Sequence, residues 1–202
     1  MGGVPVPKET IKQKRAYRRT SETQQIIFDT AMDIMREKGF QGTTVREICA
    51  SAGIPVGTFY NCYKSKVDIL RRIYDEGDAY ICNAINREAE GRSAIGQLRV
   101  FSEYYARLNE RTGIDVLRVL FYPTNAWFSM NRPMQIFIRR VVDAGQRNGE
   151  MRRELPADEI IDCLFDILRG ICYNWCVCDG AFDLSLRIRT HMDLFCAAIE
   201  AK

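Results

Sequence analysis

Residues 56–66 carry side chains suited to contact DNA. Their sequence is VGTFYNCYKSK, and helical spacing gives this stretch an outer face of Gly57, Thr58, Asn61 and Lys64. Threonine and asparagine can donate to and accept from base edges, and tyrosine hydroxyls and lysine ammonium groups can reach phosphates. Because glycine costs a helix about 1 kcal/mol relative to alanine, this composition favours close approach to a groove over helix stability.

Two short amphipathic helices with a break between them would position these residues. Thr44-x-x-Glu47 forms a capping box that begins the first helix. Gly53 suits the left-handed position after its end, and Pro55 suits the opening of the next helix because it lacks an N–H that would have no partner there. Two short helices joined through such a turn predict a helix-turn-helix. A plain helical hairpin with a polar exterior is the alternative.

Helical periodicity continues through the rest of the chain, and no segment alternates as a strand. The predicted fold is all-α, with an N-terminal three-helix helix-turn-helix bundle followed by a larger helical bundle, and about nine helices in total. The expected helices cover residues 21–39, 44–52, 56–63, 65–91, 94–110, 113–122, 133–148, 157–178 and 184–200.

Three parts of the chain are expected to have different roles. Residues 1–19 are a flexible basic arm, residues 20–66 the helix-turn-helix domain, and residues 67–202 the larger helical domain. A solvated tail and an arm that touches DNA remain equal alternatives for the first part.

Charge is distributed unevenly along the chain. Residues 1–66 hold 11 Lys/Arg and 6 Asp/Glu, whereas the remainder holds 18 and 20. A basic N-terminal third indicates a polyanionic partner. No apolar run approaches the roughly 20 residues that span a bilayer, and the N-terminus lacks the apolar core of a secretory signal. We therefore expect a cytoplasmic protein with no membrane partner.

The residues of the chain offer little for metal or enzyme chemistry. Among the eight cysteines, Cys172 and Cys176 share a helix face, but Cys178 points elsewhere and the only histidine, His191, lies in another segment. We expect mostly reduced, mostly buried cysteines, no metal site and no cofactor, with a redox-sensing role left open. There is no glycine-rich phosphate loop and no nucleophile with a plausible histidine partner, so the sequence does not favour an enzyme.

The stretch TVREICASAGIPVGTFYNCYKSKVDIL resembles the DNA-binding domain of the tetracycline-repressor (TetR) family of bacterial regulators. The resemblance covers about residues 22–70. The positions that match in register are Thr44, Ile48, Ala52, Gly53, Gly57, Thr58, Tyr60, Lys66 and Leu70. The chain departs from the family pattern at Cys49, at Tyr63 and at Pro55-Val56. The last departure removes the side-chain cap of the second short helix and one polar contact.

The resemblance implies a ligand-responsive transcriptional regulator. It implies a repressor that binds a palindromic double-stranded DNA operator as a homodimer and releases it when a small hydrophobic or aromatic effector binds. A helical protein-interaction adaptor without DNA binding is the alternative. The predicted DNA contacts are Thr44, Arg46, Val56, Gly57, Thr58, Tyr60, Asn61, Tyr63, Lys64 and Lys66.

Aromatic residues are dense between positions 100 and 140, where a loop interrupts the helical pattern. We expect them to line the effector site, although such a set is more often core. They are Phe101, Tyr104, Tyr105, Phe121, Tyr122, Trp127, Phe128 and Phe137. The single histidine and the scattered carboxylates disfavour a metal chelate or a highly charged effector.

Two wide apolar stripes near the C-terminus predict a dimer interface in the form of a four-helix bundle. Burial within one chain is the alternative. The stripe residues are Ile160, Leu164, Ile167, Leu168, Ile171, Leu184, Ile188, Met192 and Phe195.

Overall fold

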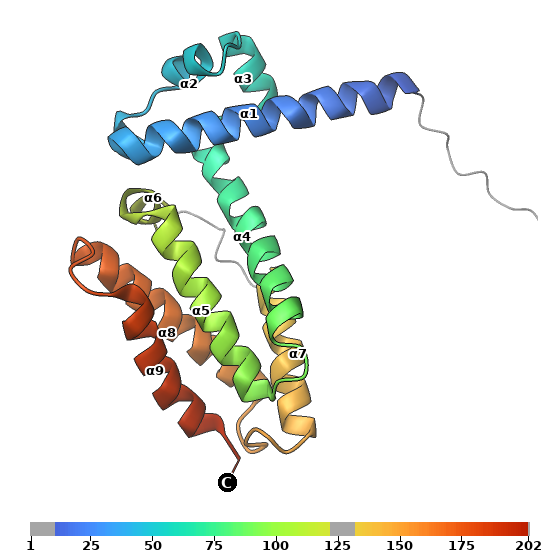
Figure 1. The fold of residues 1–202 in the computed structure, drawn as a ribbon, viewed down its shortest axis with the longest axis vertical. Coiled ribbons are helices and arrows are strands. Elements are labelled where there is room, and N and C mark those ends of the chain that lie inside the picture. Colours follow the sequence, from blue (N-terminus) through green and yellow to red (C-terminus); the bar gives the residue numbers. More distant parts are fainter. Residues whose placement is uncertain (1–10, 122–131, 202) are drawn as a thin grey trace, which may run out of the picture. The chain divides into compact units, whose positions relative to one another are not determined.

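The computed structural model describes residues 11–121 and 132–201, with the backbone alone for residues 11–19 and 74. Within these ranges the chain forms nine α-helices (Figure 1). They are α1 (Ile11–Gly42), α2 (Val45–Ser51), α3 (Val56–Cys62), α4 (Lys66–Glu88), α5 (Ala94–Thr112), α6 (Ile114–Leu120), α7 (Pro133–Arg147), α8 (Ala157–Val177) and α9 (Leu184–Ile199). The all-α prediction is confirmed, and the ends of α2–α9 lie within three residues of their predicted positions.

The first helix differs most from its prediction. It begins at Ile11 instead of Ser21, so the part of the predicted flexible arm that the structure describes, residues 11–19, is helical. This segment reads IKQKRAYRR, which contains no Pro or Gly and several strong helix formers, so the helix extends without a hydrophobic face. Gly39, the predicted end of the helix, breaks the helical geometry with φ 73° and ψ 167°.

The chain divides into two compact units, Met1–Ile69 and Leu70–Lys202. In the N-terminal unit, α1, α2 and α3 pack against one another. Ile27, Ile48 and Phe59 are fully buried between them, so each of the two short helices contributes an apolar anchor to a shared core.

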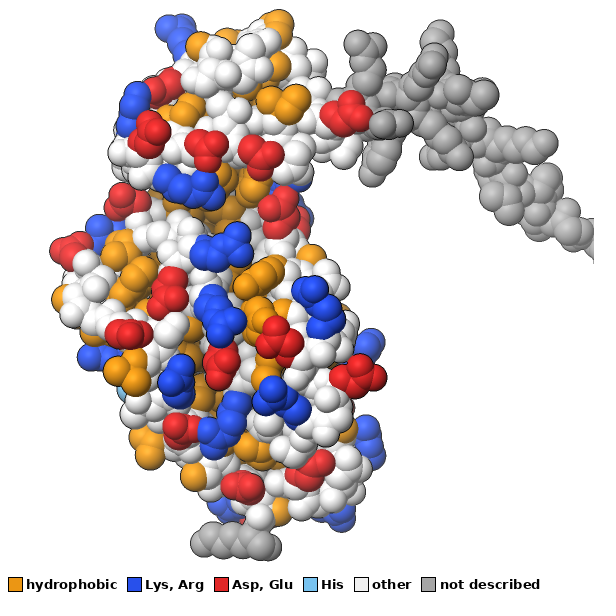
Figure 2. Space-filling model, viewed as in Figure 1, with side chains coloured by type: hydrophobic (Ala, Val, Ile, Leu, Met, Phe, Trp, Pro, Cys, Tyr) orange, Lys and Arg blue, Asp and Glu red, His pale blue; other side chains and the backbone are white. Residues whose placement is uncertain are grey.

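The C-terminal unit is a helical bundle in which α5 packs against α7 and α9, and α8 packs against α6, α7 and α9 (Figure 1). Its core includes Leu98 and Phe101 of α5, Ile138 of α7, and Leu164 and Leu168 of α8. On the face seen in Figure 2, acidic and basic side chains of this unit are interspersed.

The predicted dimer stripes lie inside this core, which corrects the prediction. Eight of the nine residues are buried within the unit, and Ile167 is half-buried. The physical reason is that α8 and α9 use this face to close the bundle against α5 and α7. The eight are Ile160, Leu164, Leu168, Ile171, Leu184, Ile188, Met192 and Phe195.

All eight cysteines carry free thiols, but fewer are buried than predicted. Cys49, Cys172, Cys176 and Cys196 are buried, whereas Cys163 and Cys178 are exposed. Burial raises the pKa of the Cys172 thiol far above its usual range, so this group remains a neutral core side chain.

None of the helices in the described ranges is long and apolar enough to cross a bilayer.

Candidate DNA-binding surface and effector cavity

The turn between α2 and α3 has the geometry that its sequence predicts. Thr44 is the N-cap of α2, and its side-chain oxygen accepts a hydrogen bond from the N–H of Glu47 at 3.2 Å. Gly53 has φ 65°, in the left-handed region that favours glycine. Pro55 follows as the N-cap of α3, with an extended backbone. The chain therefore changes direction between the two helices without leaving a strained residue.

Phe59 fixes the orientation of α3. Its side chain is 0% exposed, and its ring lies 5.4 Å from that of Tyr60 and 5.8 Å from that of Tyr63. Because an α-helix has about 3.6 residues per turn, burial of Phe59 directs the opposite side of α3 toward solvent. Val56, Gly57, Tyr60 and Asn61 are exposed, and Tyr60 retains 56% of its surface.

Thr58 is half-buried, and Thr44, Arg46 and Lys64 are exposed. The Thr44 hydroxyl accepts from the backbone as a helix cap, which leaves its own hydrogen available for a phosphate oxygen. These residues, with the exposed face of α3, form one polar and aromatic surface, defined here as the α3 surface.

Gly57 has no structural role within the chain that the described contacts account for. A Cβ atom built at this position meets nothing within 4 Å, and its φ is not positive. Alanine would therefore fit and would stabilise the helix. The open space at Gly57 leaves room for the close approach of another molecule.

Two of the predicted DNA contacts also have hydrogen-bond partners within the N-terminal unit. Tyr63 is 9% exposed, and its hydroxyl donates to the carbonyl oxygen of Gln24 at 3.0 Å. The ammonium group of Lys66 donates to the carbonyl oxygens of Thr43, at 2.7 Å, and Phe40. Burial also lowers the pKa of Lys66. Both side chains join α1 to the end of the helix-turn-helix, a role that spacing alone does not distinguish from phosphate contact.

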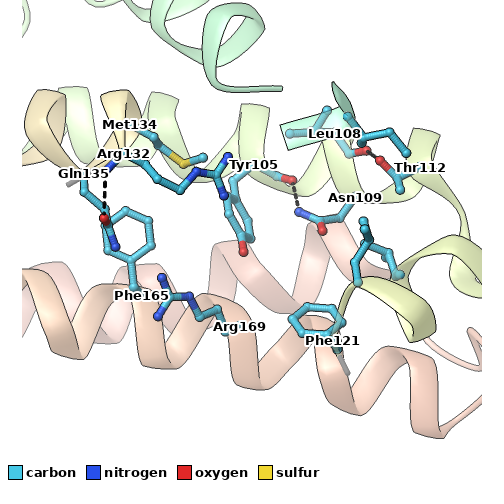
Figure 3. A pocket seen from close by; sticks show the side chains of 13 residues that line it. Tyr105, Leu108, Asn109, Thr112, Phe121, Arg132, Met134, Gln135, Phe165 and Arg169 are labelled. Carbon is cyan, nitrogen blue, oxygen red and sulfur yellow. Dashed lines mark hydrogen bonds between the residues drawn. The ribbon is translucent and has the colours of Figure 1, made fainter. Parts of the chain in front are cut away.

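A small cavity of about 50 Å³ lies in the C-terminal unit (Figure 3). Its described lining is mostly apolar and comes from α4, α5, α6, α7 and α8. The lining residues are Ile73, Tyr105, Leu108, Asn109, Thr112, Leu117, Leu120, Phe121, Arg132, Met134, Gln135, Phe165 and Arg169.

The aromatic cluster only partly predicts this lining. Tyr105 and Phe121 line the cavity, while Tyr122, Trp127 and Phe128 lie outside the described residues. Three others are absent from the described lining. Phe101 and Phe137 pack in and against the core, and the hydroxyl of Tyr104 bonds to the carboxylate of Glu88.

The polar residues of the lining were not predicted from the sequence. The side chain of Asn109 donates to the carbonyl oxygen of Tyr105 at 2.7 Å, and that of Thr112 donates to the carbonyl oxygen of Leu108 at 2.8 Å. Both side chains therefore bond to the backbone of their own helix. Arg132 and Arg169 bring two guanidinium groups to the cavity. A pair of arginines separated by more than thirty residues carries no periodic signal, so only the fold brings them together.

Comparisons with known proteins assign the helix-turn-helix. Residues 27–73 match the model of a family described as bacterial regulatory proteins, tetR family. The chain therefore carries a TetR-family DNA-binding domain near its N-terminus. It is therefore a DNA-binding transcriptional regulator and not an enzyme.

Relatives of low sequence identity are also transcriptional regulators. The HTH-type transcriptional repressor DhaR of Mycobacterium sp. (strain GP1) is 25% identical over 163 residues, which cover 72% of this chain and 78% of that protein. The HTH-type transcriptional regulator AcrR of Shigella flexneri is 22% identical, over 89% of this chain and 90% of that protein.

Solved structures support the same TetR fold. FadR from Bacillus subtilis, in complex with stearoyl-CoA, aligns with a TM-score of 0.70 at 19% identity, covering 87% of this chain and 98% of that one. Thermus thermophilus FadR, in complex with lauroyl-CoA, aligns with a TM-score of 0.67 at 25% identity, covering 85% and 92%.

Tyr63→Phe should weaken the N-terminal unit while leaving its outer face intact. The change removes the hydrogen bond to Gln24, which should lower the free energy of unfolding by about 1 kcal/mol. Urea denaturation followed by circular dichroism measures this loss. An unchanged midpoint together with a large loss of DNA affinity would show that the hydroxyl contacts DNA instead.

Gly57→Ala should change stability and DNA affinity in opposite directions. Replacing this glycine in the first turn of α3 should raise the free energy of unfolding by up to about 1 kcal/mol, while the new methyl group should lower DNA affinity by obstructing close approach. Urea denaturation and fluorescence anisotropy with labelled duplex measure the two effects. Unchanged DNA affinity would contradict the proposed approach of DNA at Gly57.

Proposed function

We propose that this TetR-family protein is a repressor that reads its operator with the α3 surface and releases it when a small ligand binds the C-terminal cavity. The observation that carries the proposal is the exposed face of α3, where Gly57, Tyr60 and Asn61 face solvent while Phe59 is buried. Small and hydrogen-bonding side chains on such a helix suit the major groove, and Arg46 and Lys64 suit phosphates.

The ligand half of the proposal rests on the chemistry of the cavity. Its mostly apolar lining suits a hydrophobic ligand. The two FadR structures contain ligands with long apolar chains, stearoyl-CoA and lauroyl-CoA. The cavity of about 50 Å³ is far smaller than such a ligand, so binding must move the side chains around it. A ligand that prefers this expanded arrangement shifts the equilibrium away from the DNA-binding one.

Helix α4 is the element through which we expect this shift to pass. It contributes Ile73 to the cavity lining, and the same helix begins at Lys66, whose ammonium group bonds within the N-terminal unit. A displacement of α4 at the cavity therefore has a covalent route to the helix-turn-helix.

We propose a homodimer formed by the outer sides of α8 and α9, in place of the buried stripes that the sequence indicated. Exposed apolar side chains remain there, including Tyr173, Val177 and Leu194, the last of which is 69% exposed. Gly170 lies beside them, and a Cβ atom built there meets nothing within 4 Å, which leaves room for a partner helix. A two-fold dimer would pair with a palindromic operator, and we place the protein in the cytoplasm with its DNA.

Tyr60→Ala should lower affinity for the cognate duplex by about tenfold or more, because Tyr60 is the largest exposed side chain on α3 and a lost phosphate or base contact costs about 1–3 kcal/mol. Duplex recovered by selection from the host genome and fluorescence anisotropy provide the measurement. Ile26→Ala is the matched control, since Ile26 is an exposed apolar residue of α1 in the same unit, and it should bind normally.

A salt titration of the same complex separates the regulator from a protein-binding adaptor. Affinity should fall steeply as salt concentration rises, because phosphate contacts release counterions. Equal affinity of the Tyr60→Ala and Ile26→Ala variants, or affinity independent of salt, would contradict the proposal.

Leu194→Glu should convert a dimer into a monomer, because it places a charge in the proposed apolar interface. Light scattering of the purified chain at micromolar concentration should give twice the chain mass for the unmodified protein and the single mass for the variant. Ile136→Glu on α7, also at an exposed apolar position, should remain dimeric. A monomeric unmodified chain would overturn the dimer.

A further inference from the structure

A buried ion pair joins α4 to the start of α7. Asp78 is 3% exposed, and its Oδ2 atom accepts a hydrogen bond from Nε of Arg132 at 3.1 Å. Its Oδ1 atom lies 3.0 Å from Nη2 of Arg132 but makes no hydrogen bond of good geometry within the part of the chain that the structure describes. This carboxylate is therefore buried with an incomplete set of partners.

Because the hydrogen bonds of Asp78 are incomplete, another anion can replace this carboxylate as the partner of Arg132. Burial raises the pKa of Asp78, an effect larger than the lowering by Arg132, so the environment disfavours the charged carboxylate even with its partner present. A buried ion pair must compensate for the lost hydration of both groups, and a missing hydrogen bond weakens that compensation. An anion that offers Arg132 both oxygens in one plane would match the guanidinium better.

Arg132 is also part of the cavity. It lines the cavity together with Arg169, whose guanidinium lies 5.2 Å from the ring centre of Phe165. In Figure 3 both arginine side chains lie toward the Phe165 and Gln135 part of the lining, and Leu108, Thr112 and Phe121 lie toward the other part. The described lining contains no acidic residue. The cavity thus combines a cationic part with an apolar part.

We propose that the effector is an amphipathic anion whose acidic group binds Arg132 and Arg169 in place of Asp78. This inference rests on the proposed function, since it names the ligand class of the same cavity. The apolar part of the ligand lies against Leu117, Leu120 and Phe121. Loss of Arg132 leaves Asp78 buried without its partner and removes the tie between α4 and the start of α7, and α4 is the helix that also holds Lys66.

The same pair therefore sets both specificity and response. An uncharged apolar ligand enters the cavity without taking Arg132 from Asp78, and α4 stays attached to the start of α7. An anionic ligand of equal chain length breaks that attachment. Selectivity for the charged ligand and release of DNA are then two results of one exchange of partners.

The test compares three probes of equal chain length on the purified full chain without DNA, by isothermal titration calorimetry. Laurate offers a carboxylate, lauroyl-CoA offers phosphates and a thioester, and methyl laurate offers no charge. We expect at least one anionic probe to bind tenfold or more tightly than the ester, and the stronger of the two identifies the acidic group. Equal binding of all three, or binding of none, would overturn the inference.

Variants of the pair make the test specific to Asp78 and Arg132. Asp78→Asn removes the competitor for Arg132 and should strengthen binding of the preferred anion about tenfold, with the ester unchanged. Arg132→Gln and Arg169→Gln should each weaken the anion about tenfold. Arg139→Gln is the matched control, because Arg139 lies on α7 and pairs with Asp158 at the surface, and it should bind like the unmodified chain. Unchanged anion affinity in Asp78→Asn would overturn the inference.

DNA release separates this inference from the proposed function. If methyl laurate releases the selected duplex as effectively as the anions, the regulator stands and the exchange at Arg132 is wrong. If the chain binds no duplex at all, the proposed function fails. The anion preference is then still decided by the calorimetry, which is measured without DNA.

Discussion

The burial of Phe59 is the contact on which the account of DNA recognition depends. Helix α3 has seven residues, too few for a stable isolated helix in water, so its fold and orientation come from packing. Phe59 is its one fully buried side chain. With that ring held against α1 and α2, helical geometry leaves Gly57, Tyr60 and Asn61 no direction except outward. One side of α3 thus carries the side chains for DNA recognition, and the opposite side stabilises the N-terminal unit by packing.

Much of this arrangement could be predicted from the sequence because its signals are local. The cap at Thr44, the left-handed Gly53 and the helix ends from α2 to α9 depend on residues close in the chain. The long first helix was not predictable from hydrophobic periodicity, since residues 11–19 lack it. The roles of Tyr63 and Lys66 depend on backbone carbonyls of α1 and the following turn, more than twenty residues away, and residue type alone cannot identify such partners.

The C-terminal unit was predictable in its elements but not in its surfaces. A helix such as α8 is apolar around much of its circumference, so periodicity shows that Leu164 and Ile167 are apolar without showing that Leu164 is fully buried and Ile167 only half-buried. The same limit applies to the aromatic residues, because Phe101 fills the core while Tyr105 lines the cavity. Arg132 and Arg169 reach the same cavity only through the packing of α7 and α8, and their guanidinium groups give an otherwise mostly apolar cavity a cationic part.

Photo-crosslinking from α3 tests the central claim most directly. Asn61 is replaced by p-benzoylphenylalanine in one variant and Ile26 by the same residue in another, since both positions are exposed in the N-terminal unit. After irradiation with the selected duplex, position 61 should form a covalent adduct with operator DNA and position 26 should form little. Equal adducts from both positions, or an adduct from position 26 alone, would show that DNA meets another face of this unit.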